Sequence, residues 1–168
     1  MSWTASMSIR RSLSFEFERA IQQIRHKMSY LAIHLGPDTK TVPGHSGAQA
    51  MKMNYFVVGT NDKDASTRFY DAFFAEFGIK QVMSNDRMTY WQSEDFAFAV
   101  AIPFDEQAAT NGNGTMVGFA LESEDAVQRL HSKVIELGGK CAGAPGNRGP
   151  MFSAYVRDLD NNKLCFSA

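Results

Sequence analysis

The stretch YVRDLDNNKLCF, residues 155–166, decides the fold expected for this chain of 168 residues. Tyr155 and Val156 favour a strand, and an apolar run resumes at residues 164–166. Between these runs lie Asp and Asn residues, which hydrogen-bond their own backbone and tolerate the left-handed conformation of a tight turn. The stretch therefore predicts a β-hairpin at this end of the chain.

Residues 53–168 divide into two copies of one pattern of elements. Each copy has a strand, a helix followed by glycine, and three further strands, which together make a βαβββ unit. The first copy spans about residues 53–104, with strands expected at 53–58, 80–84, 87–92 and 96–102 and a helix at 63–77. The second spans about residues 114–168, with strands expected at 115–121, 140–142, 153–157 and 163–166 and a helix at 123–137.

Two of the expected strands alternate bulky apolar residues with glycine or alanine. Val117 and Phe119 alternate with Gly118 and Ala120, and residues 96–102, FAFAVAI, follow the same pattern. Because neighbouring residues of a strand point to opposite faces, the bulky side chains pack under a helix and the small ones line a cavity. The predicted fold class is α+β, with paired βαβββ modules forming a concave mixed sheet whose outer face carries the helices.

Composition excludes several classes of protein. With 44% hydrophobic residues the chain can bury a core, and it has no apolar run of the ~18 residues needed to span a bilayer. Residues 51–168 contain eleven Lys and Arg against fifteen Asp and Glu, a balance that argues against a nucleic-acid surface. The two cysteines form no disulfide framework and no CxxC motif, so we expect a cytoplasmic protein.

Residues 1–50 form an N-terminal arm outside the repeated pattern. Apolar residues at helical spacing predict an amphipathic helix over about 15–35, and Gly, Pro, Ser and Thr predict a flexible linker over 36–50. An alternative is a mis-called start, because Met51 and Met53 immediately precede the repeat. The arm could also be an organelle-targeting peptide, which Glu16 and Glu18 weaken, or a helix that docks on a partner protein.

The terminal hairpin resembles the "Y-x-R-D-P-D-G-N-x-L-E" signature of the vicinal oxygen chelate superfamily, which includes glyoxalase I, the bleomycin- and fosfomycin-resistance proteins and the extradiol dioxygenases. Residues 59–79 resemble its "V-x-D-x-x-x-S-x-x-F-Y" helix entry, and the matching residues are Asp62, Ser66, Phe69 and Tyr70. The hairpin departs from the signature at Leu159, Asn161 and Cys165, where the family has Pro, Gly and Glu. The resemblance covers about residues 53–168 and implies a glyoxalase/bleomycin-resistance-like domain with a cup-shaped sheet.

The resemblance also identifies the positions that hold a metal ion in metal-using members. A His of the first strand is replaced here by Tyr55, a His or Gln of the second repeat by Met116, and the terminal Glu by Cys165. Tyr, Met and Cys do not form a suitable set for the hard or borderline divalent ions of the family, although a soft ion such as Cu(I) accepts Met and Cys. We therefore expect neither a metal ion nor another cofactor.

Without the ion, the Lewis acid of the family's chemistry is lost but the pocket is not. The resemblance then implies a metal-independent protein that binds and sequesters a small organic molecule. The alternative is a glyoxalase-like lyase or isomerase that uses Tyr55, Tyr155 or Cys165 in place of the ion. The expected partners are a small organic molecule and a second copy of the chain in a homodimer, with no nucleic acid and no membrane.

Further pocket residues are expected on the terminal hairpin and on one loop. Tyr155 and Arg157 have the same parity, so both could face the cavity, where Arg157 would receive an anion and Tyr155 would stack or donate a hydrogen bond. Alternatively, Arg157 pairs with Asp158 or Asp160. The expected loop CAGAPGNRGP, residues 141–150, contains GAPGNRG, which resembles a recurrent loop in one bacterial branch of the superfamily. The resemblance implies that Arg148 lies near the mouth of the cup. The candidate substrate-pocket residues, none of them assigned a catalytic role, are Tyr55, Met116, Cys165, Tyr155, Arg157 and Arg148.

Overall fold

A computed structural model describes residues 53–168, and the arm and linker expected over residues 1–50 lie outside the described residues. The first module contains β1 (Tyr55–Gly59), α2 (Lys63–Ala75), β2 (Lys80–Ser84), β3 (Met88–Gln92) and β4 (Ala97–Ala101). The second module contains β5 (Val117–Ala120), α3 (Glu124–Glu136), β6 (Lys140–Arg148), β7 (Met151–Arg157) and β8 (Lys163–Ser167). This order of elements confirms the two predicted βαβββ units.

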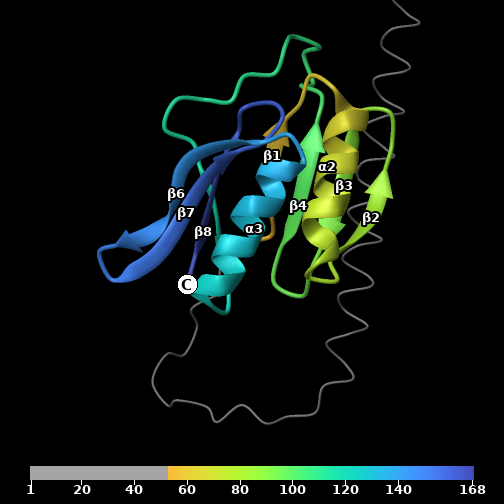
Figure 1. Cartoon of the computed structure of the whole chain (residues 1–168). Helices are drawn as coiled ribbons and strands as arrows, with labels where there is room; N and C mark the ends of the chain where they lie inside the picture. The colour runs from red at the N-terminus through yellow and green to blue at the C-terminus, as the bar shows by residue number, and fades with distance from the viewer. Residues whose placement is uncertain (1–52) are drawn as a thin grey trace, which may run out of the picture. The chain divides into compact units, whose positions relative to one another are not determined.

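Each module forms its own four-stranded sheet (Figure 1). Sheet A has the strand order β1-β4-β3-β2 and sheet B the order β5-β8-β7-β6. In both sheets the first strand of the module pairs in parallel with its last strand, and the remaining pairs are antiparallel. The α+β class with mixed sheets is therefore confirmed, and the strands divide equally between two sheets.

Local sequence sets where the helices begin and end. The Asp62 carboxylate accepts a hydrogen bond from the Ala65 N–H at 2.9 Å, and the Ser123 hydroxyl accepts one from the Ala126 N–H at 3.2 Å. These contacts satisfy N–H groups that the first turn of a helix leaves without a partner. The glycines after the helices, Gly78 and Gly138, have φ values of 65° and 94°, a conformation that costs least without a Cβ.

One hydrophobic core joins the two modules. Phe73 of α2 is 1% exposed, and its ring centroid lies 5.7 Å from that of Phe119 on β5 and 5.8 Å from that of Phe166 on β8. Phe98 of β4 and Val156 of β7 belong to the same buried cluster. The bulky residues of the alternating strands thus face the helices, as predicted, and each sheet keeps one face free of helix.

The terminal hairpin is confirmed, and it binds the second module to the first. Asn161 in its turn has a φ of 68°, the left-handed conformation expected of Asn at that place. Next to it the Tyr70 hydroxyl of α2 donates to the Asp158 carboxylate at 2.7 Å, and the Ser66 hydroxyl donates to the Asp160 carboxylate at 2.8 Å. The helix-entry and hairpin motifs, far apart in sequence, are therefore held together by hydrogen bonds.

The predicted end of one strand and the loop after it were wrong. The expected strand over 140–142 continues as β6 to Arg148, so most of the expected loop 141–150 is strand. Sequence reasoning failed here because glycine and Pro145 suggest a loop, whereas β6 is an edge strand, where proline is tolerated. Two shifts in the pairing of β6 with β7, between Cys141 and Gly143 and between Gly143 and Gly146, accommodate the glycines as bulges.

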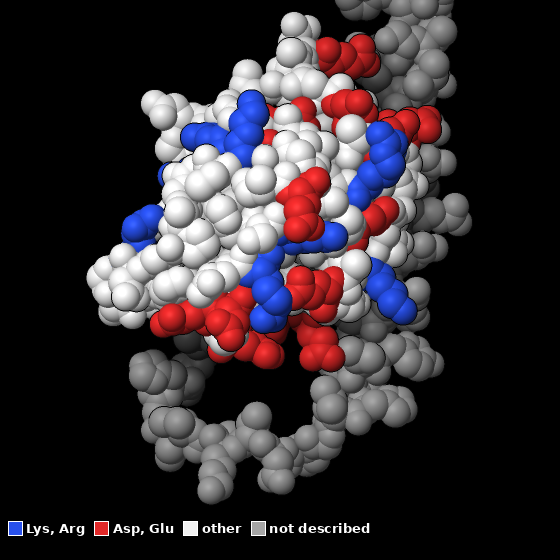
Figure 2. Space-filling model, viewed as in Figure 1, with Lys and Arg blue, Asp and Glu red and all other residues white. Residues whose placement is uncertain are grey.

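Charged side chains of both signs are interspersed over the face shown in Figure 2. Acidic side chains gather at the end where α3 begins, and Glu124 and Asp125 stand in its first turn. Carboxylates are favourable there because the positive end of the helix dipole lies at the N-terminus. Within residues 53–168, none of the helices has the length and apolar character needed to cross a membrane.

Candidate functional site

The helix-free faces of the two sheets are the candidate sites, and we call them face A and face B. Because Phe98 and Val156 point into the core, residues of opposite parity point to the helix-free faces. Face A carries Tyr55, Val57, Met88, Tyr90, Ala97, Ala99 and Ala101. Face B carries Gly118, Ala120, Gly143, Ser153, Tyr155, Arg157, Lys163 and Cys165.

Face A is filled by its own side chains. Met88, Tyr90, Ala99 and Ala101 form a second buried cluster with exposures of 6%, 7%, 0% and 5%. The ring of Tyr55 packs edge-on against that of Tyr90, with 6.3 Å between centroids, and burial raises the pKa of Tyr90. The prediction that the small residues of β4 line a cavity was therefore wrong, because Met88 and Tyr90 of the neighbouring strand pack with Ala99 and Ala101 into a buried layer.

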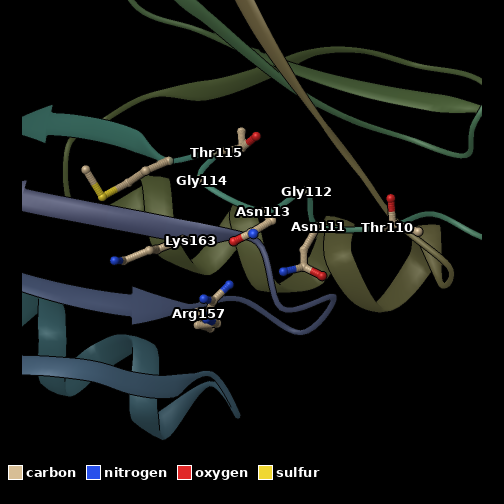
Figure 3. Close-up of a pocket in the computed structure, with 9 residues that line it drawn as sticks. Thr110, Asn111, Gly112, Asn113, Gly114, Thr115, Arg157 and Lys163 are labelled. Atoms are coloured by element: carbon tan, nitrogen blue, oxygen red, sulfur yellow. The ribbon is translucent and has the colours of Figure 1, made fainter.

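Face B borders a cavity of 610 Å³, a size typical of sites for small molecules. Its lining comprises Met116, Arg157, Lys163 and the linker between the modules, residues 110–115, as Figure 3 shows for the labelled residues. The linker is fixed at its start by Asn61, whose side chain donates to the Ala109 carbonyl at 3.1 Å and accepts from the Ala109 N–H at 2.8 Å. The cavity thus lies between a tethered polar linker and the cationic end of face B.

Tyr155 lies at the centre of face B between two cations. Its ring centroid is 5.0 Å from the Lys163 Nζ and 5.6 Å from the Arg148 Cζ, distances that suit cation–π interactions. Gly143 makes this arrangement possible, because a Cβ there would lie 2.8 Å from the Tyr155 Cδ2 atom. Arg148 is also held by a hydrogen bond from its Nη2 to the Ala144 carbonyl at 3.1 Å.

Arg157 does not form the ion pair considered as an alternative from the sequence. Its Nη1 donates to the Asn161 carbonyl at 2.7 Å, while Asp158 and Asp160 accept from Tyr70 and Ser66. A guanidinium has five N–H donors, so this contact leaves most of them for a ligand. The side chain lines the cavity with Lys163, its direct partner across the β7–β8 pair.

Cys165 pairs directly with Tyr155 across the same two strands. Burial raises the pKa of its thiol, and the opposing effects of Lys163 and Tyr155 do not reverse that direction. A thiol with a raised pKa supplies little of the thiolate that acts as a nucleophile. The geometry therefore favours the interpretation of Cys165 as part of the wall of the site.

The structure brings five of the six predicted pocket residues to one side of sheet B and separates the sixth from them. Met116, Arg148, Tyr155, Arg157 and Cys165 lie on face B, at its edge or in its cavity, whereas Tyr55 lies on face A. Sequence reasoning missed Lys163 and the linker 110–115. Lys163 could have been found from its parity with Cys165, but the linker gave no comparable signal.

The residues at the family's ligand positions do not fit the metal ion that the resemblance implies. A phenol, a thioether and a thiol of raised pKa are poor donors for a hard or borderline divalent ion, and Tyr55 lies on the other sheet from Met116 and Cys165. In the described part of the chain, no three or more His, Cys, Asp and Glu side chains are grouped in a way that could hold an ion.

Comparison with known structures gives close similarity to one family. A glyoxalase/bleomycin resistance protein from Albidiferax ferrireducens is 34% identical, with a TM-score of 0.65, and the match covers 68% of this chain and 96% of that one. A glyoxalase-related enzyme from Fulvimarina pelagi is 21% identical, with a TM-score of 0.61 over 70% of this chain and 88% of that one. A lactoylglutathione lyase from Agrobacterium tumefaciens is 16% identical, with a TM-score of 0.53 over 73% of this chain and 95% of that one. The last two similarities concern the fold alone. No family model and no curated protein matches the chain.

Proposed function

The chain belongs to the glyoxalase/bleomycin resistance/dioxygenase superfamily, and on that premise we propose that it binds and sequesters a small organic molecule on face B without a metal ion. The observation that carries the proposal is the cavity of 610 Å³ between the linker and face B. Gly118 and Ala120 lie outside the cavity lining but are exposed on the same face, where their small side chains leave the surface of sheet B uncovered. Arg157 and Lys163 supply polar contacts that would orient it.

Binding without an ion is supported by the donor chemistry of the site. The positions that hold the ion in metal-using members carry side chains unsuited to it, so a ligand would be held by cations, hydrogen bonds and apolar contacts. Turnover by the alternative route, with Tyr155 or Cys165 acting in place of the ion, has less support because burial raises the pKa of the Cys165 thiol.

Isothermal titration with a panel of aromatic alcohols, amines and acids tests the proposal. We expect at least one compound to bind with 1:1 stoichiometry, with the same affinity in EDTA and with no change in its mass after incubation. Residue 118 lies two positions along the chain from the lining residue Met116 and points to the same side of the strand, so the ring of Gly118→Phe would crowd the cavity and should weaken binding roughly tenfold or more. The Cβ of residue 118 meets no atom within 4 Å, so Gly118→Ala is the matched control that leaves the space open.

Three results would contradict the proposal. Binding that disappears in EDTA would show that an ion is required, and binding insensitive to Gly118→Phe would move the site away from face B. Chemical conversion of a bound compound would favour the lyase or isomerase instead.

The proposal extends to a homodimer in the cytoplasm. Strands β1 and β5 stand at the edges of their sheets, and edge strands are common sites of association. Cys141 and Cys165 are free thiols, which suits a reducing compartment. Light scattering of the purified chain should give the mass of two copies, and the mass of one copy would refute the dimer.

A further inference from the structure

Three cations form a row across face B. Lys140 of β6 pairs directly with Arg157 of β7, which pairs directly with Lys163 of β8. Residues paired in this way across antiparallel strands point to the same face, with their Cβ atoms about 5 Å apart. We call Lys140, Arg157 and Lys163 the basic row. Like charges placed directly opposite one another destabilise a sheet, so the arrangement has a cost in stability.

No acidic side chain within the described residues neutralises the basic row. The ion pairs within 4.0 Å there are Lys63–Asp64 and Arg129–Glu76, which involve none of its members. The strands β5, β6, β7 and β8 contain neither Asp nor Glu. Asp158 and Asp160, one and three positions after Arg157, accept hydrogen bonds from Tyr70 and Ser66 instead.

The row also differs from the corresponding part of sheet A. The strands of sheet A contain one basic residue, Lys80, whereas those of sheet B contain Arg148 as well as the basic row. Arg148 and Lys163 flank the ring of Tyr155, which extends the positive charge along face B. Positive charge is thus concentrated on the sheet that borders the cavity.

We propose that the ligand of face B is a small organic dianion, carrying a phosphate group or two carboxylates, whose charged group binds Arg157 and Lys163. This inference rests on the proposed function. A guanidinium matches the geometry of both groups with two parallel hydrogen bonds, and the Lys163 ammonium adds a second positive charge beside it. Two neighbouring cations complement a ligand with two negative charges better than a ligand with one.

The other walls of the cavity fit the rest of such a ligand. Asn111 and Asn113 of the linker line the same cavity, and Figure 3 shows their side chains extending from the linker toward Arg157. Their amide groups can hydrogen-bond a polar substituent, and Met116 offers apolar contact at the end of β5. The volume of 610 Å³ suits a small molecule and is too small for a polymeric anion.

Isothermal titration with three aromatic compounds of similar size tests the inference. Phenyl phosphate and phthalate carry the two candidate dianionic groups, and benzyl alcohol carries no charge. We expect one of the dianions to bind roughly tenfold or more tightly than benzyl alcohol, and more weakly as the salt concentration rises. The dianion that binds more tightly identifies the head group as phosphate or dicarboxylate.

Charge-removing variants locate the binding site. Arg157→Gln and Lys163→Gln should each weaken binding of the preferred dianion roughly tenfold. Gln at 157 keeps an amide donor for the Asn161 carbonyl. Lys80→Gln is the matched control, because it removes the same charge from a strand of sheet A and should leave affinity unchanged. The melting temperature of Lys163→Gln should equal or exceed that of the wild type, since the variant relieves repulsion within the basic row.

The inference fails separately from the proposed function. If benzyl alcohol binds as tightly as both dianions, or if neither variant in the basic row lowers affinity, the ligand is not a dianion held by the row. The Gly118→Phe test then still decides whether a small molecule binds on face B. If none of the three compounds binds, and no compound of the panel of aromatic alcohols, amines and acids binds, both the inference and the proposed function are wrong.

Discussion

On face A, Tyr90 and Ala99 are 7% and 0% exposed, whereas on face B Gly118 and Ala120 are exposed. Arg157 and Lys163 of face B also line a cavity of 610 Å³. The two faces come from the same βαβββ pattern and lie opposite the same shared core. Aromatic and methionine side chains fill face A, whereas face B combines glycine, alanine and cations with the ring of Tyr155. The difference shows that a repeated architecture can keep one copy packed and leave the other open.

A substitution in the core shared by the two modules has the largest expected effect on stability. Phe73→Ala removes a ring that is 1% exposed and contacts Phe119 and Phe166 of the second module. We expect the free energy of unfolding to fall by about 3–5 kcal/mol, because the missing ring leaves a void in the core. Both modules should unfold in a single transition, because they share that core. Urea denaturation followed by near-UV and far-UV circular dichroism measures both.

The control for this experiment is Phe104→Ala. Phe104 is 78% exposed, so its truncation should change the stability by less than about 1 kcal/mol. Two separate unfolding transitions in Phe73→Ala, one of them unchanged from the wild type, would mean that the modules are independent and that the faces cannot be compared as parts of one unit.

The next largest effect concerns the contact between the modules. Burial raises the pKa of Asp158, and hydrogen bonds from Asn162 and Tyr70 oppose that rise. The folded chain therefore holds the Asp158 proton more tightly than the unfolded chain does. This group's contribution to stability falls as pH rises from the ordinary carboxyl value of 3.8 through the folded value.

Tyr70→Phe removes a donor to the ionised carboxylate and raises the pKa of Asp158 further. We expect a loss of about 2–3 kcal/mol at neutral pH, which shrinks below about pH 4 where Asp158 is protonated in both proteins. Thermal denaturation at several pH values measures it. Tyr55→Phe is the control, because it removes a hydroxyl from a side chain that is 45% exposed. Its free energy of unfolding should lie within about 0.5 kcal/mol of the wild-type value at every pH. A pH-independent loss in Tyr70→Phe would contradict the coupling to Asp158.

A pair of enlarging substitutions, one on each face, compares the two faces directly. Ala99→Val enlarges a residue that is 0% exposed on face A and should cost about 1 kcal/mol through overpacking. Gly118→Ala adds a Cβ that meets no atom within 4 Å on face B, and restricting the unfolded chain should stabilise the protein by about 0.5 kcal/mol. Chemical denaturation of both variants measures whether each substitution raises or lowers the free energy of unfolding. Equal losses of stability in both variants would mean that face B is as tightly packed as face A.

Much of this contrast was not visible in the sequence. Period-two alternation predicted which residues of β4 and β5 face the helices, and the turn residues predicted the β7–β8 hairpin, because both signals are local. Alternation alone could not show that Met88 and Tyr90 would fill face A, since that depends on the order of strands within the sheet. Tyr55 was grouped with Met116 and Cys165 because the resemblance puts all three at the family's ligand positions, and the structure places it in the other sheet.

The basic row shows a second limit of sequence reasoning. The pairing of Arg157 with Lys163 follows from a hairpin turn between them, so Lys163 was within reach of prediction. The pairing of Lys140 with Arg157 depends on two bulges in β6, whose positions the glycines suggest but do not determine. Long-range register therefore decided which charges meet, and only the structure supplies it.

The smallest expected effect comes from the cation at the end of the basic row. Lys140 is exposed and lies directly opposite Arg157, so Lys140→Gln should raise the free energy of unfolding by about 0.2–1 kcal/mol through relief of repulsion. Because salt screens exposed charges, the gain should largely vanish near 1 M salt, and denaturation at low and high salt measures the difference. Lys133→Gln on α3 is the control, since it removes a charge outside face B and should show no such gain. If Lys140→Gln destabilised the protein at low salt, Lys140 would not be repelled by Arg157. The arrangement of cations that distinguishes face B from face A would then be wrong.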